Sequence, residues 1–220
     1  MNKHVIIVAG GVGKRMHSEI PKQFLNVAGK PVLIHTFESF INYSKDIQIT
    51  LVLPEPFIDF WKSLCKKFNF EVEHTVVKGG KTRFNSVRNG LKIIEDDSLV
   101  AIHDGVRPLV SKETLNRVFK KASETGNAIP AVKINESLRK ISDDASFSVN
   151  RREYRLIQTP QCFQSELIKQ AYEQEYQEEF TDDATVVETM GIKINLVEGN
   201  IENIKITRPG DIKIATAFLK

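Results

Sequence analysis

The feature that most constrains the fold is a regular alternation between short apolar runs and segments of helical periodicity. The runs have the length of single strands, whereas the segments between them repeat apolar residues every three or four positions. Predicted strands cover residues 5–9, 47–54, 74–78, 99–104 and 128–134, and predicted helices cover residues 31–42, 57–68, 83–95 and 112–126. Because such alternation produces βαβ units, the sequence predicts an α/β fold with a mostly parallel sheet covered by helices.

The length of the chain suits this fold as a single Rossmann-like domain. With 220 residues, of which 41% are hydrophobic, the chain can bury a sizeable core, and no linker, repeat or low-complexity tract divides it. We therefore expect one domain over residues 1–220. The N-terminal apolar run is too short for a signal peptide and no stretch is long enough to span a membrane, which predicts a cytoplasmic protein without membrane attachment.

One segment departs from the alternation of strands and helices. Residues 137–151 read SLRKISDDASFSVNR, in which polar and apolar residues alternate on either side of an Asp143-Asp144 turn. This pattern predicts a β-hairpin with too little apolar surface to be a core element. The pattern alone leaves two interpretations open, a projecting arm that contacts a partner and an exposed edge hairpin.

The charge composition disfavours nucleic acid as the main partner. The chain has 31 Lys and Arg residues against 28 Asp and Glu residues, a formal net charge of +3 that is evenly scattered. Local cations that bind an anionic small molecule suit this balance better. Cys65 and Cys162 lie far apart, with no second Cys or His at metal-ligand spacing, so we expect buried free thiols and neither a zinc site nor a disulfide.

Residues 5–24, VIIVAGGVGKRMHSEIPKQF, join a predicted strand to a Gly-rich turn. A Walker A loop does not fit, because Val8 stands where its first glycine would be and Arg15 where it requires Ser or Thr. A dinucleotide-binding fingerprint does not fit either, because Met16 replaces its third glycine. Backbone N–H groups of glycines and nearby cations nevertheless suit a nucleoside triphosphate. The residues concerned are Gly10, Gly11, Gly13, Lys14, Arg15 and Lys22.

Five ordered blocks carry a resemblance to a known family. AGGVGKRM, followed by PKQFL, resembles the signature of nucleotidyltransferases that join a sugar or polyol phosphate to a nucleotide. The further blocks are GGKTRFNSV, HDGVRP, QTPQCF with TDDA, and NIKITRPGD. In this order the blocks resemble the 2-C-methyl-D-erythritol 4-phosphate cytidylyltransferase family over nearly the whole chain. The resemblance implies transfer of a cytidylyl group from CTP to 2-C-methyl-D-erythritol 4-phosphate, which gives 4-diphosphocytidyl-2-C-methyl-D-erythritol and pyrophosphate in the non-mevalonate pathway of isoprenoid synthesis.

The ribitol-5-phosphate cytidylyltransferases of teichoic acid synthesis share several of these blocks and are the alternative. Two features favour the erythritol enzymes, namely the four residues between Met16 and Pro21 and the element VNRREYRLIQTPQ. Two departures concern the acceptor side. Residues 104–107 read Asp-Gly-Val-Arg where the family usually has Asp-Ala-Ala-Arg, and Ser137 stands where it usually has Thr. A nucleotide sensor that keeps the binding loop without catalysis is a third interpretation.

The resemblance also implies roles for individual residues. Arg15 and Lys22 would be catalytic, because they would stabilise negative charge around the α-phosphorus. The residues implied in CTP binding are Ala9, Gly10, Gly11, Gly13, Lys14, Gly80, Lys81, Ser86 and Asp104. The residues implied in acceptor binding are Asp104, Arg107, Ser137, Arg151, Thr159, Thr181 and Lys205. We expect Mg²⁺ to accompany the phosphates of CTP, with Asp104 as a candidate ligand.

The resemblance bears on the hairpin as well. In that family the arm crosses to the other subunit, which implies a homodimer with exchanged arms. Arg107, Ser137 and Arg151 would then act in the active site of the partner. The resemblance therefore favours the projecting arm over the edge hairpin.

Overall fold

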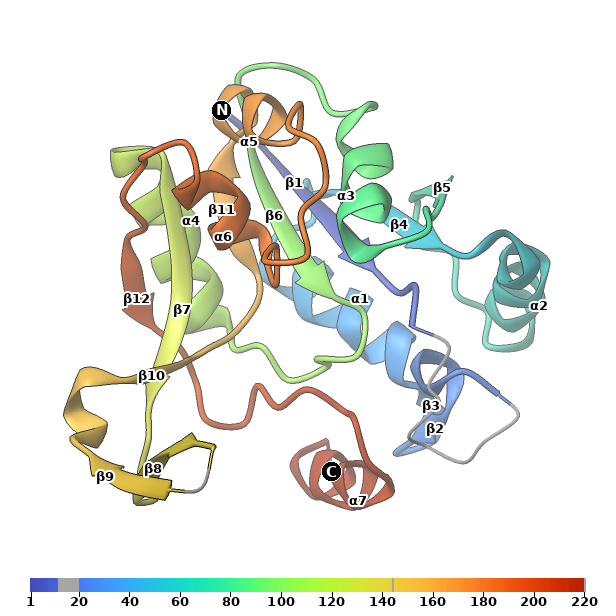
Figure 1. Ribbon diagram of the computed structural model, residues 1–220. Helices are drawn as coiled ribbons and strands as arrows, with labels where there is room; N and C mark the ends of the chain where they lie inside the picture. Colours follow the sequence, from blue (N-terminus) through green and yellow to red (C-terminus); the bar gives the residue numbers. More distant parts are fainter. Residues whose placement is uncertain (12–19, 144, 220) are drawn as a thin grey trace.

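A central sheet of eight strands runs through the computed structural model, which describes residues 1–11, 20–143 and 145–219 (Figure 1). Its strands are β1 (Asn2–Val8), β4 (Gln48–Leu53), β5 (Thr75–Lys78), β6 (Ser98–Asp104), β7 (Asn127–Lys133), β10 (Arg155–Ile157), β11 (Gln161–Gln164) and β12 (Leu196–Glu198). The order is β10-β7-β11-β6-β1-β4-β5, and β12 pairs with β7. All five strands predicted from the sequence are present.

The sheet is mostly parallel, as predicted. Strand β1 lies between β4 and β6 and is parallel to both, and β4 is parallel to β5. Two strands are exceptions: β11 lies between β6 and β7 and is antiparallel to each, and β10 is antiparallel to β7. The residues of β6 are all buried, which explains the apolar run from Leu99 to Ile102.

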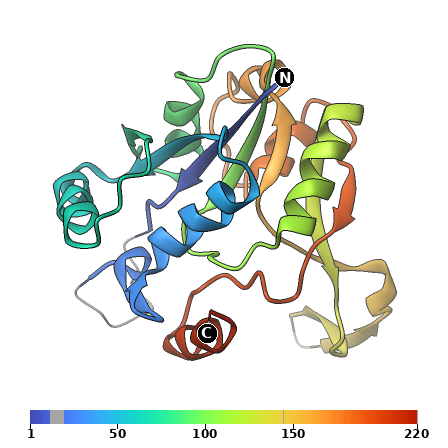
Figure 2. The ribbon, with the colours of Figure 1, turned by 180° about the vertical axis from the view of Figure 1, so that it is seen from behind.

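Helices cover both faces of the sheet. The helices of the described chain are α1 (Val32–Tyr43), α2 (Ile58–Lys67), α3 (Arg83–Leu91), α4 (Lys112–Thr125), α5 (Ser165–Ala171), α6 (Asp183–Glu188) and α7 (Pro209–Phe218). Helices α1 and α4 pack on one face (Figure 2), where Phe40 and Leu115 are fully buried. Helices α3, α5 and α6 pack on the other, around Phe163 and Val187. The two faces therefore bury separate apolar clusters, as expected for a sheet between two helical layers.

The helix ends follow local sequence signals. The side chains of Thr82 and Ser111 accept hydrogen bonds from backbone N–H groups in the first turns of α3 and α4. Helix α4 ends at Gly126, whose φ of 85° lies in the left-handed region. The helix predicted over residues 83–95 is shorter than expected and ends at Leu91, because the following residues form the connection to β6.

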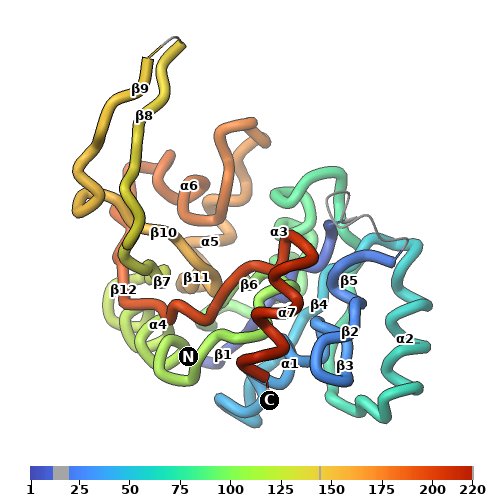
Figure 3. The backbone as a smooth tube through the Cα atoms, turned by 90° about the horizontal axis from the view of Figure 1, so that it is seen from below, coloured from blue at the N-terminus to red at the C-terminus, as the bar shows by residue number. Residues whose placement is uncertain are grey.

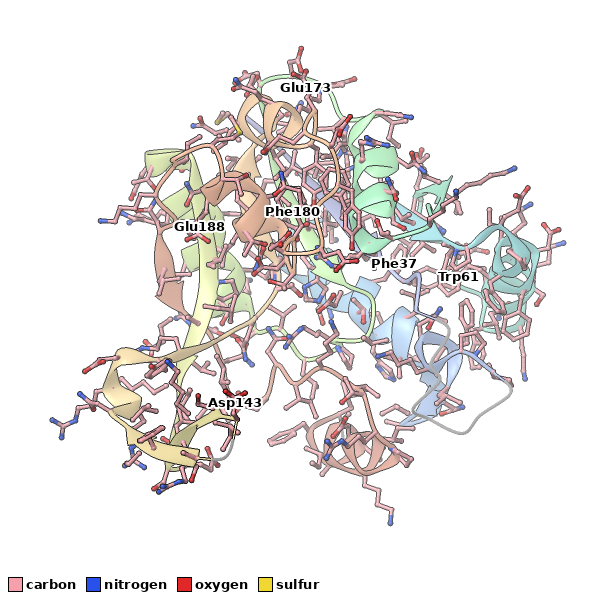
Figure 4. The ribbon with its side chains drawn as sticks, in the orientation of Figure 1. Phe37, Trp61, Asp143, Glu173, Phe180 and Glu188 are labelled. Carbon is pink, nitrogen blue, oxygen red and sulfur yellow. The ribbon has the colours of Figure 1, made fainter. Side chains whose placement is uncertain are left out.

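Helix α2 lies beside the sheet and is held there by aromatic side chains. The rings of Phe37 on α1 and Trp61 on α2 are stacked with centroids 5.6 Å apart (Figure 4). Trp61 is almost fully buried and its Nε1 donates a hydrogen bond to His74 at 2.9 Å. This contact joins α2 to the start of β5.

The predicted hairpin is confirmed and projects from the rest of the molecule (Figure 3). Strands β8 (Leu138–Ser142) and β9 (Ala145–Val149) pair antiparallel only with each other, and Asp144 of the turn lies outside the described residues. We call residues 137–151 the arm. Ile141 is 72% exposed and Phe147 56% exposed, so the arm carries apolar surface that its own chain leaves uncovered.

Several short elements complete the described chain. A small hairpin is formed by β2 (Asn26–Val27) and β3 (Lys30–Pro31), and three 3-10 helices are η2 (Lys22–Phe24), η3 (Glu55–Phe57) and η4 (Arg151–Glu153). Within the described ranges, no helix combines the length and the apolar character needed to cross a membrane.

Candidate functional site

A cavity of about 320 Å³ lies at the carboxyl ends of β1 and β6. Backbone hydrogen bonds align these ends, because Gly105 donates to the carbonyl of Val8 at 2.9 Å and Ala9 donates to that of Val52 at 3.0 Å. Ligands of open α/β sheets bind at this edge. The structure brings these predicted site residues to the cavity wall: Ala9, Gly10, Gly11, Lys22, Gly80, Lys81, Ser86, Asp104 and Lys205.

Asp104 is a buried carboxylate at this cavity, and three cationic side chains lie around it. Its Oδ2 lies 3.1 Å from Nζ of Lys205 and 3.1 Å from Nε of Arg107, and its Oδ1 lies 3.9 Å from Nε of Arg83. Burial alone would raise the pKa of the carboxyl, but the charges of Arg83, Lys205 and Arg107 outweigh it and hold the pKa well below its ordinary value. Asp104 is therefore ionised and orients these cations instead of accepting a proton.

Arg83 is fixed at the cavity wall by an ion pair with Asp183, the first residue of α6. Its guanidinium donates to both carboxylate oxygens, at 2.8 and 2.6 Å, and the hydroxyl of Tyr172 donates to the same carboxylate at 2.6 Å. Burial would lower the pKa of Arg83, but the charge of Asp183 raises it above its ordinary value. Arg83 was not among the site residues expected from the sequence, although it is the last residue of GGKTR.

The turn before α3 forms another wall of the cavity. The backbone N–H of Gly80 donates to Oγ of Ser86 at 3.0 Å, and this hydroxyl donates to the carbonyl of Thr82 at 2.9 Å. A Cβ atom at Gly80 would lie 2.3 Å from Cβ of Asn85, so the turn requires glycine here. Lys81 is exposed at its tip.

The Gly-rich turn that begins at Ala9 is held by Gln23, which was not among the site residues expected from the sequence. Gln23 is 1% exposed, and its Nε2 donates to the carbonyl of Ala9 at 2.8 Å. Lys22 precedes it in η2 and lines the cavity. Gly13, Lys14 and Arg15 lie outside the described residues.

The predicted acceptor residues fall into two places. Lys205 and Arg107 contact Asp104 directly, and the hydroxyl of Thr159 accepts a hydrogen bond from the Asp104 backbone N–H at 3.1 Å. Arg107 was expected to act in the site of the partner, but it lies three residues after Asp104 and pairs with that carboxylate in its own chain. Ser137 and Arg151 instead line a separate hollow of about 290 Å³ on the arm. The guanidinium of Arg151 donates to the carbonyl of Asn135 at the base of the arm.

Thr181 is exposed just before α6, and it is not among the residues that line the cavity. The structure thus brings Lys205, Arg107 and Thr159 into contact with Asp104. Of the predicted acceptor residues, Asp104 and Lys205 line the cavity, whereas the following do not: Arg107, Ser137, Arg151, Thr159 and Thr181.

The residues at the cavity fit a metal ion only as a companion of bound phosphates. Among the described residues, no group of three or more His, Cys, Asp or Glu side chains is placed to hold a metal. Asp104 is the one carboxylate among the described residues lining the cavity, and its Oδ1 is engaged less closely by cations than its Oδ2. One carboxylate oxygen together with phosphate oxygens and water is a common environment for Mg²⁺.

The sequence matches the family model described as IspD, 2-C-methyl-D-erythritol 4-phosphate cytidylyltransferase, over residues 3–220. The enzyme of that name from Bacteroides thetaiotaomicron is 54% identical over 219 residues, which cover 100% of both chains. The enzyme from Bacteroides fragilis is 50% identical with the same coverage.

Solved structures show the same similarity. The 4-diphosphocytidyl-2C-methyl-D-erythritol synthase of Anaerococcus prevotii superposes with a TM-score of 0.83 at 32% identity, covering 99% of this chain and 96% of the other. The 2-C-methyl-D-erythritol 4-phosphate cytidylyltransferase of Thermus thermophilus superposes with a TM-score of 0.80 at 30% identity, covering 99% and 98%. Sequence and fold agree along the whole length, and the chain belongs to the 2-C-methyl-D-erythritol 4-phosphate cytidylyltransferase family of nucleotidyltransferases.

Proposed function

We propose that the chain transfers the cytidylyl group of CTP to 2-C-methyl-D-erythritol 4-phosphate, releases pyrophosphate, and thereby supplies an isoprenoid precursor. The observation that carries the proposal is the cavity at Asp104, where cations from three distant segments, Arg83, Arg107 and Lys205, meet one carboxylate in a chain whose family match spans residues 3–220. A cationic pocket of this kind suits a reaction between two phosphates.

The nucleoside of CTP would lie between the first turn and the turn at Gly80. Backbone edges at Ala9, Gly10 and Gly80 offer hydrogen bonds to a base, and the side chain of Ser86 holds the second turn in place. A cavity of about 320 Å³ leaves little room beyond a pyrimidine and its ribose. The site is therefore expected to prefer CTP to ATP and GTP.

The chemistry needs alignment and positive charge more than proton transfer. A phosphate oxygen of the acceptor attacks the α-phosphorus of CTP, the bond from that phosphorus to the bridging oxygen breaks, and pyrophosphate leaves with the electron pair. Lys22 lines the cavity and would stabilise the charge that grows on the α-phosphate, together with Arg15. Mg²⁺ bound to the phosphates would supply further positive charge, with Asp104 as its contact on the protein.

The acceptor would lie on the side of the cavity where Lys205 and Arg107 meet Asp104. Lys205 is partly exposed and can reach the acceptor phosphate while it contacts Asp104. Asp104 can accept hydrogen bonds from the hydroxyl groups of a polyol. Thr181 would join the phosphate site from the start of α6.

The active site would be completed in a homodimer. Ser137 and Arg151 lie on the arm, apart from the cavity of their own chain, so they would act in the partner's cavity. Exposed apolar residues near the base of the arm would be covered in such a dimer; they are Tyr154, Leu156, Ile157, Leu196 and Ile201. Because CTP is an intracellular metabolite, this dimer would work in the cytoplasm.

An acceptor panel tests the proposal. The purified chain is incubated with CTP and Mg²⁺, and pyrophosphate is measured with 2-C-methyl-D-erythritol 4-phosphate, with ribitol 5-phosphate and with no acceptor. The expected result is fast release with the first acceptor alone and a product of the mass of 4-diphosphocytidyl-2-C-methyl-D-erythritol. CTP binding without pyrophosphate for either acceptor would instead indicate a nucleotide sensor, and release with ribitol 5-phosphate alone would indicate the teichoic acid enzyme.

A further inference from the structure

His103 is a buried histidine that lies directly before Asp104 at the end of β6 and does not line the cavity. Both of its ring nitrogens have partners. Nε2 lies 3.0 Å from the backbone carbonyl oxygen of Arg107, and Nδ1 lies 3.1 Å from Oγ1 of Thr159. The ring thus connects two residues that flank Asp104.

The partners determine which nitrogen carries the hydrogen. A carbonyl oxygen can only accept, so Nε2 of His103 must donate to Arg107. His103 is fully buried, and its two ring partners are a carbonyl and a hydroxyl, so a protonated ring would have no charged partner in contact; the ring is neutral and has a single N–H. Nδ1 therefore carries a lone pair and accepts a hydrogen bond.

The hydroxyl of Thr159 is oriented as a consequence. It donates its one hydrogen to Nδ1 of His103, and it accepts from the Asp104 backbone N–H at 3.1 Å. A second contact holds the same residue, because Nδ2 of Asn203 donates to the Thr159 carbonyl at 2.8 Å. The carbonyl of Asn203 in turn accepts from the guanidinium of Arg107 at 2.8 Å.

We infer that His103 is a positioning residue that sets the direction of the Thr159 hydroxyl and thereby holds the backbone of Asp104. In this arrangement the hydrogen of the Thr159 hydroxyl is already used, so it is not available to an ionised phosphate, which can only accept. Thr159 then holds the backbone of Asp104 through its hydrogen bond with the Asp104 N–H and does not bind the acceptor phosphate itself. The kinetic test of this inference rests on the proposed function, whereas the spectroscopic test uses the protein without substrate.

The spectroscopic test needs no substrate. Long-range ¹H–¹⁵N correlation of the histidine rings distinguishes a ring protonated at Nε2 from one protonated at Nδ1, and His103→Asn identifies the signals. At pH 7 we expect His103 as the Nε2–H form, and Thr159→Val should shift its Nδ1 resonance because the donor is lost. An Nδ1–H form, or a Nδ1 resonance that Thr159→Val leaves unchanged, would overturn the inference whether or not the chain is active.

The kinetic test uses two variants of His103, each of which keeps one of its two hydrogen bonds, either the one with Thr159 or the one with Arg107. In His103→Asn the amide oxygen can replace Nδ1 as the acceptor for Thr159, whereas in His103→Gln the amide nitrogen can replace Nε2 as the donor to Arg107. We expect kcat/KM for the polyol phosphate to fall about 10- to 100-fold in His103→Gln and in Thr159→Val, and less than about threefold in His103→Asn and Thr159→Ser. KM for CTP should change little in all four.

Combining the variants separates positioning from direct binding. If Thr159 acts through His103, the double variant His103→Gln/Thr159→Val should be no worse than either single variant. If Thr159 contacts the acceptor phosphate directly, the two losses should multiply, and that result would overturn the inference. Thermal unfolding of each variant shows that the compared proteins are folded. If the wild-type chain is inactive with every acceptor, the proposed function is rejected. The tautomer of the His103 ring would still decide whether His103 positions Thr159.

Discussion

The guanidinium of Arg83 donates two hydrogen bonds to the carboxylate of Asp183, at 2.8 and 2.6 Å, across two helices that are far apart in the sequence. Asp183 is fully buried, and Arg83 also lies 3.9 Å from Asp104 at the cavity. The pair therefore fixes helix α6 to the turn before α3 and sets the position of one cavity wall. Removing one member leaves a charge near the protein interior without its partner.

Asp183→Ala should accordingly lower the free energy of unfolding by about 3 to 5 kcal/mol in urea titrations. Asp59→Ala is the matched control, because Asp59 pairs with Lys62 at an exposed position and should cost less than about 1 kcal/mol. The double variant Arg83→Met/Asp183→Leu should recover much of the stability lost in Asp183→Ala, because neither charge remains buried. Equal losses in Asp183→Ala and Asp59→Ala would show that the buried pair has no special role.

The burial of His103 predicts a dependence of stability on pH. Burial lowers its pKa from 6.5 to about 4, so the unfolded chain binds a proton more readily than the folded chain between these values. The contribution is therefore fully present above pH 6.5, and it is lost as the pH falls toward 4. Between pH 7.5 and pH 5 this loss amounts to about 2 kcal/mol.

Urea unfolding of the wild type and of His103→Asn at these two pH values measures the contribution. The loss on acidification should be about 2 kcal/mol smaller in the variant. His4 and His74, whose pKa values are also lowered by burial, contribute to both proteins and cancel in the comparison. The same acid sensitivity in both proteins would contradict the low pKa of His103.

The central strands and the helices between them were predictable because each has a clear period. Strand β6 contains an uninterrupted apolar run from Leu99 to Ile102, and α4 combines apolar spacing with a Ser111 cap and a Gly126 stop. Strands β10, β11 and β12, which have three or four residues each, were not predicted. The insertion of β11 between β6 and β7 depends on tertiary packing, which periodicity does not encode.

Some residues of the candidate site could likewise be predicted from the sequence, and others could not. Glycine turns and an acidic residue at a strand end, such as Gly80 and Asp104, are visible in the sequence because local backbone geometry requires them. Arg83 and His103 were not assigned, because their roles depend on partners far along the chain, Asp183 and Thr159. Sequence spacing alone gives no indication of either contact.

Lys22 is predicted to act on the transition state more than on the binding of CTP. Lys22→Ala should therefore lower kcat by about 10²- to 10³-fold while KM for CTP changes much less. Lys81→Ala is the comparison variant, because Lys81 lies at the same cavity and is implied in CTP binding, so its loss should raise KM for CTP more than it lowers kcat. A rise in KM with unchanged kcat would make Lys22 a binding cation and leave the catalytic role to Arg15.

The exchanged arm can be tested by mixing two inactive variants. If Arg151 of one subunit completes the site that contains Lys22 of the other, a mixed dimer of Lys22→Ala and Arg151→Ala has one site with both native residues. Random exchange makes about half of the dimers mixed, so activity should recover to about a quarter of the wild-type value. Differently tagged chains verify that mixed dimers form. With that established, activity no higher than the sum of the separate variants would reject the exchanged arm.

Direct competition between the two polyol phosphates tests the identity of the reaction most directly. The chain is given CTP, Mg²⁺ and equal concentrations of 2-C-methyl-D-erythritol 4-phosphate and ribitol 5-phosphate, and both cytidylyl products are quantified by mass spectrometry during the first turnovers. The ratio of products equals the ratio of the two kcat/KM values, so it measures specificity without separate kinetic constants. The account predicts almost exclusively 4-diphosphocytidyl-2-C-methyl-D-erythritol; a mixture in equal amounts, or an excess of the ribitol product, would contradict it.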